Sequence, residues 1–151
     1  MAVSVRYEVE GWGVGELWLD GPTLLYHELP VRAGIAGGDN TLSERLRSYF
    51  AGARDSFADV AIDVDDATPF QQTVVAALRR VPFGEVVTYG ELAALAGYPN
   101  AHRAAGSVCA HNRWPIVVPC HRVVAATGMG TYGASGVEVK RRLLELENVF
   151  L

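Results

Sequence analysis

The sequence predicts an α/β chain in two parts, a strand-rich first half and a mostly helical second half. In residues 1–66 the apolar side chains gather in short runs separated by glycine or proline, as in antiparallel strands joined by tight turns. From Pro69 onward the apolar residues take the spacing of helices. The change falls within an acidic, polar connection, and we place the domain boundary there, with predicted domains 1–66 and 67–151.

The first predicted domain is an antiparallel meander followed by a helix. Apolar residues at helical spacing, among them Leu42 and Leu46, predict a helix over Thr41–Phe50. His27 has neither cysteine nor histidine close to it in the sequence, so we expect a surface strand residue rather than a metal ligand. The expected strands are Val3–Val9, Gly15–Asp20 and Leu24–Leu29, with Phe57–Val64 as the candidate for a further strand.

The second predicted domain begins with a helix whose first residue is Pro69, a residue suited to that position. Thr88 and Glu91 fit a capping box, which predicts a short helix that stops at Gly97. A turn then leads into a second helix over residues 101–111. Two short helices joined by a glycine-containing turn form a helix-turn-helix, although helical hairpins of this length also occur in proteins that do not bind DNA.

Composition narrows the class of protein. Half of the 151 residues are hydrophobic, which is enough to fill a core. No apolar run approaches the ~20 residues of a membrane span, and the first residues lack the basic head and apolar middle of a signal peptide. The two cysteines, Cys109 and Cys120, are too few for a disulfide scaffold and form no metal-binding Cys-x-x-Cys. We therefore expect a cytoplasmic protein with free thiols, no bound metal and no membrane contact, and we take a monomer as the default.

Charge is divided unevenly along the chain. Residues 1–78 hold five basic and twelve acidic side chains, a net charge of −7, whereas residues 79–142 hold eight basic and three acidic ones, a net charge of +5. A basic face on the second half would suit a phosphate backbone. An ordinary solvated surface explains the same division, so the charge alone does not predict a nucleic-acid partner.

A histidine directly follows a cysteine inside an apolar stretch, at Cys120 and His121. Valines and other apolar residues flank the pair on both sides, which predicts burial. A free cysteine with its pKa near ~8.5 is mostly protonated at neutral pH, and an imidazole within reach, directly or through one water, can remove the proton to give a nucleophile. The alternative is a small hydrophobic cysteine in a core strand beside an incidental histidine.

Four motifs of the second half occur together in this order. They are Val81–Tyr89 ahead of the helix pair, Arg103–Gly106 in its second helix, Asn112 eight residues before the cysteine, and Pro119–Val123 around it. This set resembles the O6-alkylguanine-DNA alkyltransferases, also called methylated-DNA–protein-cysteine methyltransferases. The resemblance covers Phe70–Glu147, roughly half the chain; the first half matches only in size and strand content.

The resemblance implies a fold and an activity. The first domain would be an α/β ribonuclease-H-like domain, and the second a mostly α-helical winged helix-turn-helix alkyltransferase domain. The protein would bind double-stranded DNA, turn out an O6-alkylguanine, and move the alkyl group to its own cysteine in a single turnover, without a cofactor. O4-alkylthymine would be a second substrate.

The resemblance also implies roles for individual residues. Cys120 would be the nucleophile, His121 its base, Glu147 the acid that orients the imidazole, and Asn112 a brace for the turn before the cysteine. Each has a simpler reading, such as an exposed helix-end carboxylate for Glu147 or a common helix-terminal residue for Asn112.

DNA and substrate contacts are implied in the same way. Arg103 would fill the gap that a flipped nucleotide leaves in the duplex, at a cost of a few kcal/mol for unstacking. Tyr89 would crowd the phosphate and donate its hydroxyl to the departing purine. The spacing between Gly133 and Lys140 departs from the family pattern, so the roles of Ser135 and Lys140 stay open. The other implied contact residues are Ala104, Gly106, Cys109, Trp114, Val123, Tyr132 and Gly133.

Three other functions fit part of the sequence. Alkyltransferase-like proteins bind lesions without repairing them but replace the cysteine, which is present here as Cys120. A transcriptional regulator would use the helix pair but would leave the Cys-His pair unexplained. A cysteine hydrolase would place its nucleophile exposed at a helix N-terminus, whereas Val118–Cys120 is expected to be extended.

Overall fold

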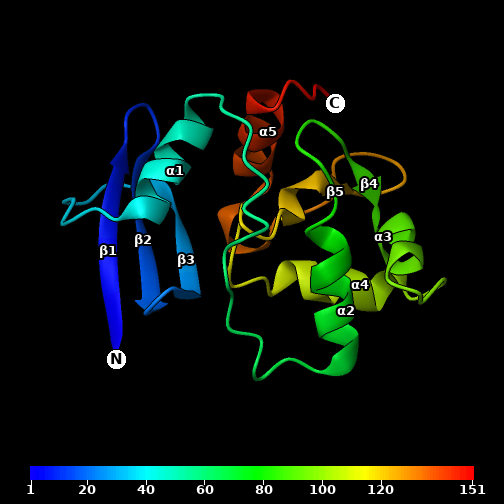
Figure 1. Ribbon diagram of the computed structural model, residues 1–151. Coiled ribbons are helices and arrows are strands. Elements are labelled where there is room, and N and C mark those ends of the chain that lie inside the picture. The colour runs from blue at the N-terminus through cyan, green and yellow to red at the C-terminus, as the bar shows by residue number, and fades with distance from the viewer. The chain divides into compact units, whose positions relative to one another are not determined.

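The computed structural model describes residues 1–151, apart from the side chain of Ala134. By its internal contacts the chain divides into two compact units (Figure 1). The first unit contains Met1–Asp63 together with the short segment Arg113–Pro115, and the second contains Val64–Asn112 and Ile116–Leu151. In the part of the chain that the structure describes, no helix combines the length and apolar character needed to cross a membrane.

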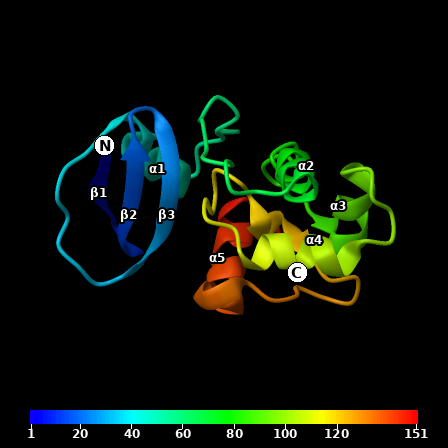
Figure 2. The ribbon, with the colours of Figure 1, turned by 90° about the horizontal axis from the view of Figure 1, so that it is seen from below.

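The first unit is a three-stranded antiparallel meander with one helix against it. The strands β1 (Ala2–Val9), β2 (Gly13–Asp20) and β3 (Thr23–Arg32) pair in sequence order. Helix α1 (Thr41–Phe50) packs beside the sheet (Figures 1 and 2). The predicted meander and helix are confirmed, and the strands run a few residues further than the apolar runs indicated. The core of this unit is formed by Tyr7, Leu17, Leu24, Leu46, Tyr49 and Phe57.

Gly15 shows why the sequence is constrained within β2. It lies opposite Tyr7 in the register of β1 and β2. An added Cβ would lie 2.7 Å from the Glu28 carbonyl oxygen and 2.8 Å from the Tyr7 ring. Only glycine lets the buried tyrosine lie flat across this strand.

The further strand predicted over Phe57–Val64 is wrong. Asp55 accepts a hydrogen bond from the Phe57 backbone N–H at 2.8 Å, and Phe57 itself has a positive φ of 51°. The carboxylate thus builds a local turn in place of a ladder, as aspartate often does. Only one isolated bridge, between Ile62 and Leu24, joins this segment to β3.

His27 was predicted to lie on the surface, and this is also wrong. Its side chain is 2% exposed. One ring nitrogen lies 2.6 Å from the Tyr7 hydroxyl, and the other lies 2.7 Å from the carbonyl oxygen of Pro115. Because a carbonyl can only accept, Nδ1 carries the proton and Nε2 accepts from Tyr7. The partners lie 20 and 88 residues away in sequence, so no local pattern could show them.

The second unit is mostly helical. Helix α2 (Pro69–Leu78) begins at the predicted proline, with Thr68 as its N-cap. The predicted capping box of Thr88 and Glu91 is confirmed at the start of α3 (Tyr89–Leu95). The remaining elements are β4 (Val87–Thr88), α4 (His102–Ala110), the 3₁₀ helix η1 (Cys120–Arg122), β5 (Val123–Val124), the 3₁₀ helix η2 (Gly133–Ser135) and α5 (Val137–Leu146).

A short parallel ladder joins two distant parts of this unit. Val87 of β4 pairs with Val123 of β5, and Thr88 pairs with Val124 (Figure 1). Tyr89 follows β4 directly, and the Cys120–Arg122 turn precedes β5 directly. The ladder therefore fixes the start of the helix pair relative to the cysteine.

Candidate functional site

Cys120 opens a tight buried turn. Ile116, Val117 and Val118 before it are almost fully buried, and Cys120 itself is 5% exposed. The predicted burial is confirmed, but the predicted extended backbone is wrong, because Cys120–Arg122 form a single 3₁₀ turn. Pro119 precedes that turn and cannot extend a strand through a backbone N–H of its own.

Asn112 holds the turn from the end of α4. Its Nδ2 donates to the carbonyl oxygen of Val118 at 2.8 Å and lies 3.0 Å from the Cys120 sulfur. Burial raises the pKa of the Cys120 thiol, while the hydrogen bonds from Asn112 and Tyr132 and the charge of Lys140 lower it in part. These donors favour the thiolate over the thiol.

A buried ion cluster lies next to the thiol. Nε2 of His121 donates to Oε2 of Glu147 at 2.7 Å, and both side chains are fully buried. Glu147 follows the last residue of α5, where its other contacts fix it in place. Arg122 donates to both of its carboxylate oxygens, at 2.9 and 3.0 Å, and the backbone N–H of Gly84 donates at 3.1 Å.

The charges in this cluster are well compensated. Burial opposes ionisation of Glu147, but the hydrogen bonds and charges of His121 and Arg122 hold the pKa of that carboxyl well below its usual range. Burial lowers the pKa of His121, and Glu147 opposes this only in part. At neutral pH the imidazole of His121 is therefore neutral, and the charge of the Glu147 carboxylate is balanced by the Arg122 guanidinium.

Arg122 is the residue of this cluster that sequence reasoning left without a role. It was noticed only as part of the motif around the cysteine. An arginine in an otherwise apolar run was the available signal, because a charge in such a run is retained only when it is paired. Its Nη1 also donates to the Val81 carbonyl at 2.8 Å, and the guanidinium lies over the Phe83 ring, 5.9 Å from the ring centroid.

The thiol lines a small pocket. The pocket volume is about 20 Å³, room for about one water molecule. Gly130, the residue before Thr131, has a φ of 76°, and a Cβ there would lie 3.3 Å from the Tyr89 hydroxyl. The lining residues are Tyr89, Gly106, Cys109, Ala110, Cys120, Thr131, Tyr132 and Gly133. The structure thus brings together five of the predicted contact residues around the predicted nucleophile.

The second thiol of the chain belongs to the same pocket. Cys109 comes from α4 and is less deeply buried than Cys120. Burial, together with the nearby Cys120, raises the pKa of Cys109 to about 12. The side-chain amide of Asn112 contacts the Cys120 sulfur at 3.0 Å, and this favours Cys120 as the nucleophile.

Four predicted contact residues lie away from the pocket lining. Arg103 and Ala104 are exposed on the first turns of α4. Val123 is fully buried in β5. Trp114 belongs to the first unit, is 4% exposed, and donates its indole N–H to the Leu24 carbonyl at 3.1 Å, so its role as a substrate contact stays a prediction. Trp114 was predicted to contact the substrate because it lies two residues after Asn112 in the sequence. A buried indole N–H needs a hydrogen-bond acceptor, and here the acceptor is the Leu24 carbonyl.

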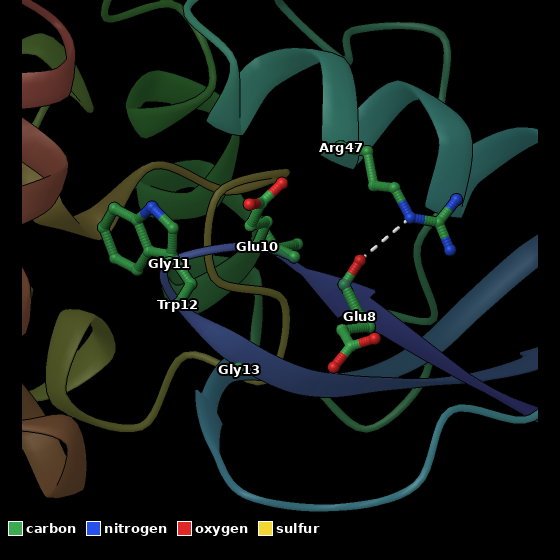
Figure 3. A pocket seen from close by; sticks show the side chains of 7 residues that line it. Glu8, Glu10, Gly11, Trp12, Gly13 and Arg47 are labelled. Atoms are coloured by element: carbon green, nitrogen blue, oxygen red, sulfur yellow. Dashed lines mark hydrogen bonds between the residues drawn. The ribbon is translucent and has the colours of Figure 1, made fainter.

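A second hollow lies in the first unit, at the turn between β1 and β2 (Figure 3). Nε of Arg47 donates to the Glu8 carbonyl at 2.9 Å, and the guanidinium also pairs with Asp39. The Trp12 ring packs on Phe50, with ring centroids 4.8 Å apart. The polar groups drawn here serve the fold of the unit, and we assign the hollow no ligand. Among the described residues, no group of three histidine, cysteine or acidic side chains is placed to hold a metal ion.

Comparison with known proteins agrees with the site. Residues 69–149 match the family model described as 6-O-methylguanine DNA methyltransferase, DNA binding domain. A methylated-DNA–protein-cysteine methyltransferase of Methanosarcina acetivorans is 47% identical over 105 residues, 70% of this chain and 66% of that protein. One from Mycobacterium tuberculosis is 47% identical over 104 residues, covering 69% and 62%. These matches span less than two thirds of the relatives' length.

Solved structures match over nearly the whole chain. The crystal structure of the Mycobacterium tuberculosis O6-methylguanine methyltransferase has a TM-score of 0.82 at 34% identity, covering 97% of this chain and 93% of that one. The enzyme from Pyrococcus kodakaraensis has a TM-score of 0.74 at 28% identity, covering 99% and 100%. A further structure, of the Mycobacterium tuberculosis protein in complex with DNA, has a TM-score of 0.81. The chain belongs to the O6-alkylguanine-DNA alkyltransferase (methylated-DNA–protein-cysteine methyltransferase) family.

Proposed function

We propose that this protein repairs DNA by direct reversal, moving the alkyl group of O6-alkylguanine to its own Cys120. The observation that carries the proposal is the juxtaposition at Cys120, a pocket-lining thiol held by Asn112 and followed by a histidine on a buried carboxylate. Nucleophile, base and orienting acid thus occur in one buried cluster.

The geometry supports a single displacement. His121 takes the thiol proton on the ring nitrogen that does not bond Glu147, directly or through one water. Arg122 keeps Glu147 ionised, so that the carboxylate stabilises the imidazolium once it forms. Sulfur then bonds to the alkyl carbon as the carbon–O6 bond breaks, and its electron pair goes to the purine. Tyr89 donates to the purine and is reprotonated from His121, so the proton moves from thiol to guanine overall. The products are S-alkylcysteine and guanine.

Substrate entry requires the pocket to widen, because about 20 Å³ cannot hold a purine. Apart from Tyr89 and Cys120, the lining residues come from α4 and the Thr131–Gly133 stretch, and we propose that these two parts separate when a flipped nucleotide enters. Tyr132 and Gly133 would then contact the base. O4-alkylthymine is proposed as a second substrate of the same pocket.

We also propose the finer assignments of fold and setting. Residues 1–66 would form a ribonuclease-H-like domain, and residues 67–151 a winged helix-turn-helix domain that binds double-stranded DNA through α4. Arg103 and Ala104 are exposed on that helix, as a groove-facing surface requires. The protein would act as a monomer in the cytoplasm, without a cofactor. A cysteine hydrolase is disfavoured because its nucleophile would lie exposed at the N-terminus of a helix, whereas Cys120 is 5% exposed in a three-residue 3₁₀ turn.

The transfer is tested by weighing the intact protein after incubation with a duplex oligonucleotide that contains O6-methylguanine. The expected result is the replacement of one hydrogen by one methyl group, mapped to the Cys120 peptide. The Cys120→Ser variant should gain no mass and should still bind the duplex, because binding depends on the helix surface and phosphate contacts. A methyl group found on the Cys109 peptide, or an unchanged mass, would refute the proposal.

Arg103→Ala is expected to slow repair of duplex DNA by about tenfold or more, and to leave the reaction with free O6-benzylguanine nearly unchanged. Only the duplex substrate needs a nucleotide extruded, at a cost of a few kcal/mol that a gap-filling side chain offsets. The measurement is the single-turnover rate on both substrates. Arg80→Ala is the matched control, since Arg80 is another exposed arginine of the basic half. Equal losses in the two variants would make Arg103 a general phosphate contact.

A further inference from the structure

Lys140 is a buried cation that the proposed chemistry does not use. It lies in the second turn of α5 and is fully buried. Its Nζ donates to the carbonyl oxygen of Thr131 at 3.0 Å and lies 5.8 Å from the centroid of the Tyr89 ring. Among the contacts of the described residues, none pairs Lys140 with a carboxylate. A buried ammonium without an anion is costly, so its retention calls for a reason.

The groups around Lys140 are those of the pocket. Thr131 and Tyr89, its two contacts, both line the pocket that contains Cys109 and Cys120. The titratable groups that interact with it are Tyr89 on α3, Cys109 on α4, and Cys120 and His121 on η1. Glu138 of its own helix pairs with Arg141, and Glu147, just beyond the end of that helix, pairs with Arg122. The anion that Lys140 lacks at rest is thus supplied only when a pocket thiol ionises.

We propose that Lys140 is a positioning residue of the alkyl transfer, whose ammonium is the counter-charge of the Cys120 thiolate and whose bond to Thr131 holds the pocket wall. The inference deepens the proposed function and depends on it only in taking Cys120 as the reacting thiol. Burial lowers the pKa of Lys140, whereas the two thiols raise it. The same charge lowers the pKa of Cys120 and disfavours protonated His121. Its net effect is therefore to stabilise the thiolate directly rather than through the base.

Two substitutions separate the charge from the hydrogen bond. Lys140→Met removes both and keeps the length of the side chain, whereas Lys140→Gln removes the charge and keeps a donor for the Thr131 carbonyl. Replacement of a buried charge by an apolar side chain of similar volume is often neutral or stabilising, so both variants are expected to fold. Arg141→Met is the control, because Arg141 is the next residue of α5 and makes a surface ion pair with Glu138.

The readout is the rate at which Cys120 is alkylated by iodoacetamide as a function of pH, measured by mass spectrometry of the Cys120 and Cys109 peptides. Thiolate absorbance in the ultraviolet, which needs no reagent access, is followed in parallel. Both Lys140 variants should react about tenfold more slowly at neutral pH, equivalent to a rise of about one unit in the pKa of Cys120, and should recover at high pH. The Arg141→Met profile should match that of the unmodified protein.

Three outcomes would overturn the inference. An unchanged pH profile in both Lys140 variants would leave the ammonium without an electrostatic role. A slower reaction in Lys140→Met alone would reduce Lys140 to a hydrogen bond to the loop. A rate lowered equally at every pH would indicate altered access rather than altered ionisation. Iodoacetamide requires no DNA repair, so a failed methyl transfer with a shifted profile would refute the proposed function and leave Lys140 as the counter-charge of the Cys120 thiolate.

Discussion

Glu147→Ala is expected to lower the free energy of unfolding by about 3–5 kcal/mol and to reduce alkyl transfer severely. The loss follows from leaving Arg122 buried without its counter-charge, since breaking one side of a buried ion pair costs far more than the pair contributes. The total stability of a domain is about 5–15 kcal/mol, so the variant would be marginal. Urea denaturation at neutral pH measures the change.

The predicted stability loss of Glu147→Ala should also depend on pH. The pKa of Glu147 is held well below its usual range in the folded state, so its contribution is present above the unfolded value near 4.5 and is lost as pH falls below it. The deficit of Glu147→Ala should therefore be full at neutral pH and should shrink in acid. Glu138→Ala is the control, because its ion pair with Arg141 is exposed and contributes at most about 1 kcal/mol. Equal losses in the two variants would contradict the assignment of a buried cluster.

The second large effect is expected at His27, far from the site. Burial lowers the pKa of His27 to about 4, against 6.5 for an unperturbed histidine. The unfolded chain therefore takes up a proton near pH 6.5 that the folded chain takes up only near pH 4. The neutral His27 imidazole therefore makes its full contribution to the free energy of unfolding above pH 6.5. This contribution, about 2–3 kcal/mol, is lost progressively as the pH falls toward 4.

His27→Gln removes this titration while retaining a side chain that can both donate and accept. Unfolding free energies of the two proteins at pH 7 and pH 4.5 form the comparison. The unmodified protein should lose about 2–3 kcal/mol more than the variant over this interval. Parallel pH dependences would mean that His27 is already protonated between Tyr7 and Pro115.

The regular elements could be predicted because their signals are local. The period of Leu42 and Leu46 and the capping residues Thr88 and Glu91 define helices within one or two turns of sequence. The cysteine motif likewise pointed to a buried thiol, and the structure adds the Asn112 contact that singles it out. What these signals share is that each is complete within about ten residues.

The features that sequence reasoning missed share the opposite property. His27, Trp114 and Arg122 are buried polar side chains whose partners lie at least twenty residues away in the sequence. A single polar residue in a strand or loop is predicted from the sequence to be exposed, because burial of a polar group without a hydrogen-bond partner is costly. Only the structure shows the distant partner that allows its burial. The 3₁₀ turn at Cys120 was missed for a related reason, since the Glu147 carboxylate that binds Arg122 of that turn lies 25 residues further along the chain.

The segment Arg113–Pro115 limits how this protein can be taken apart. It belongs by its contacts to the first unit, yet the second unit continues on both sides of it, at Asn112 and at Ile116. A chain cut near residue 63 would therefore leave the Trp114 indole without its Leu24 carbonyl and the Pro115 carbonyl without His27. A single cut of the chain therefore cannot separate the two units. A shortened protein that contains only the helical unit would need Arg113–Pro115 redesigned as a polar loop.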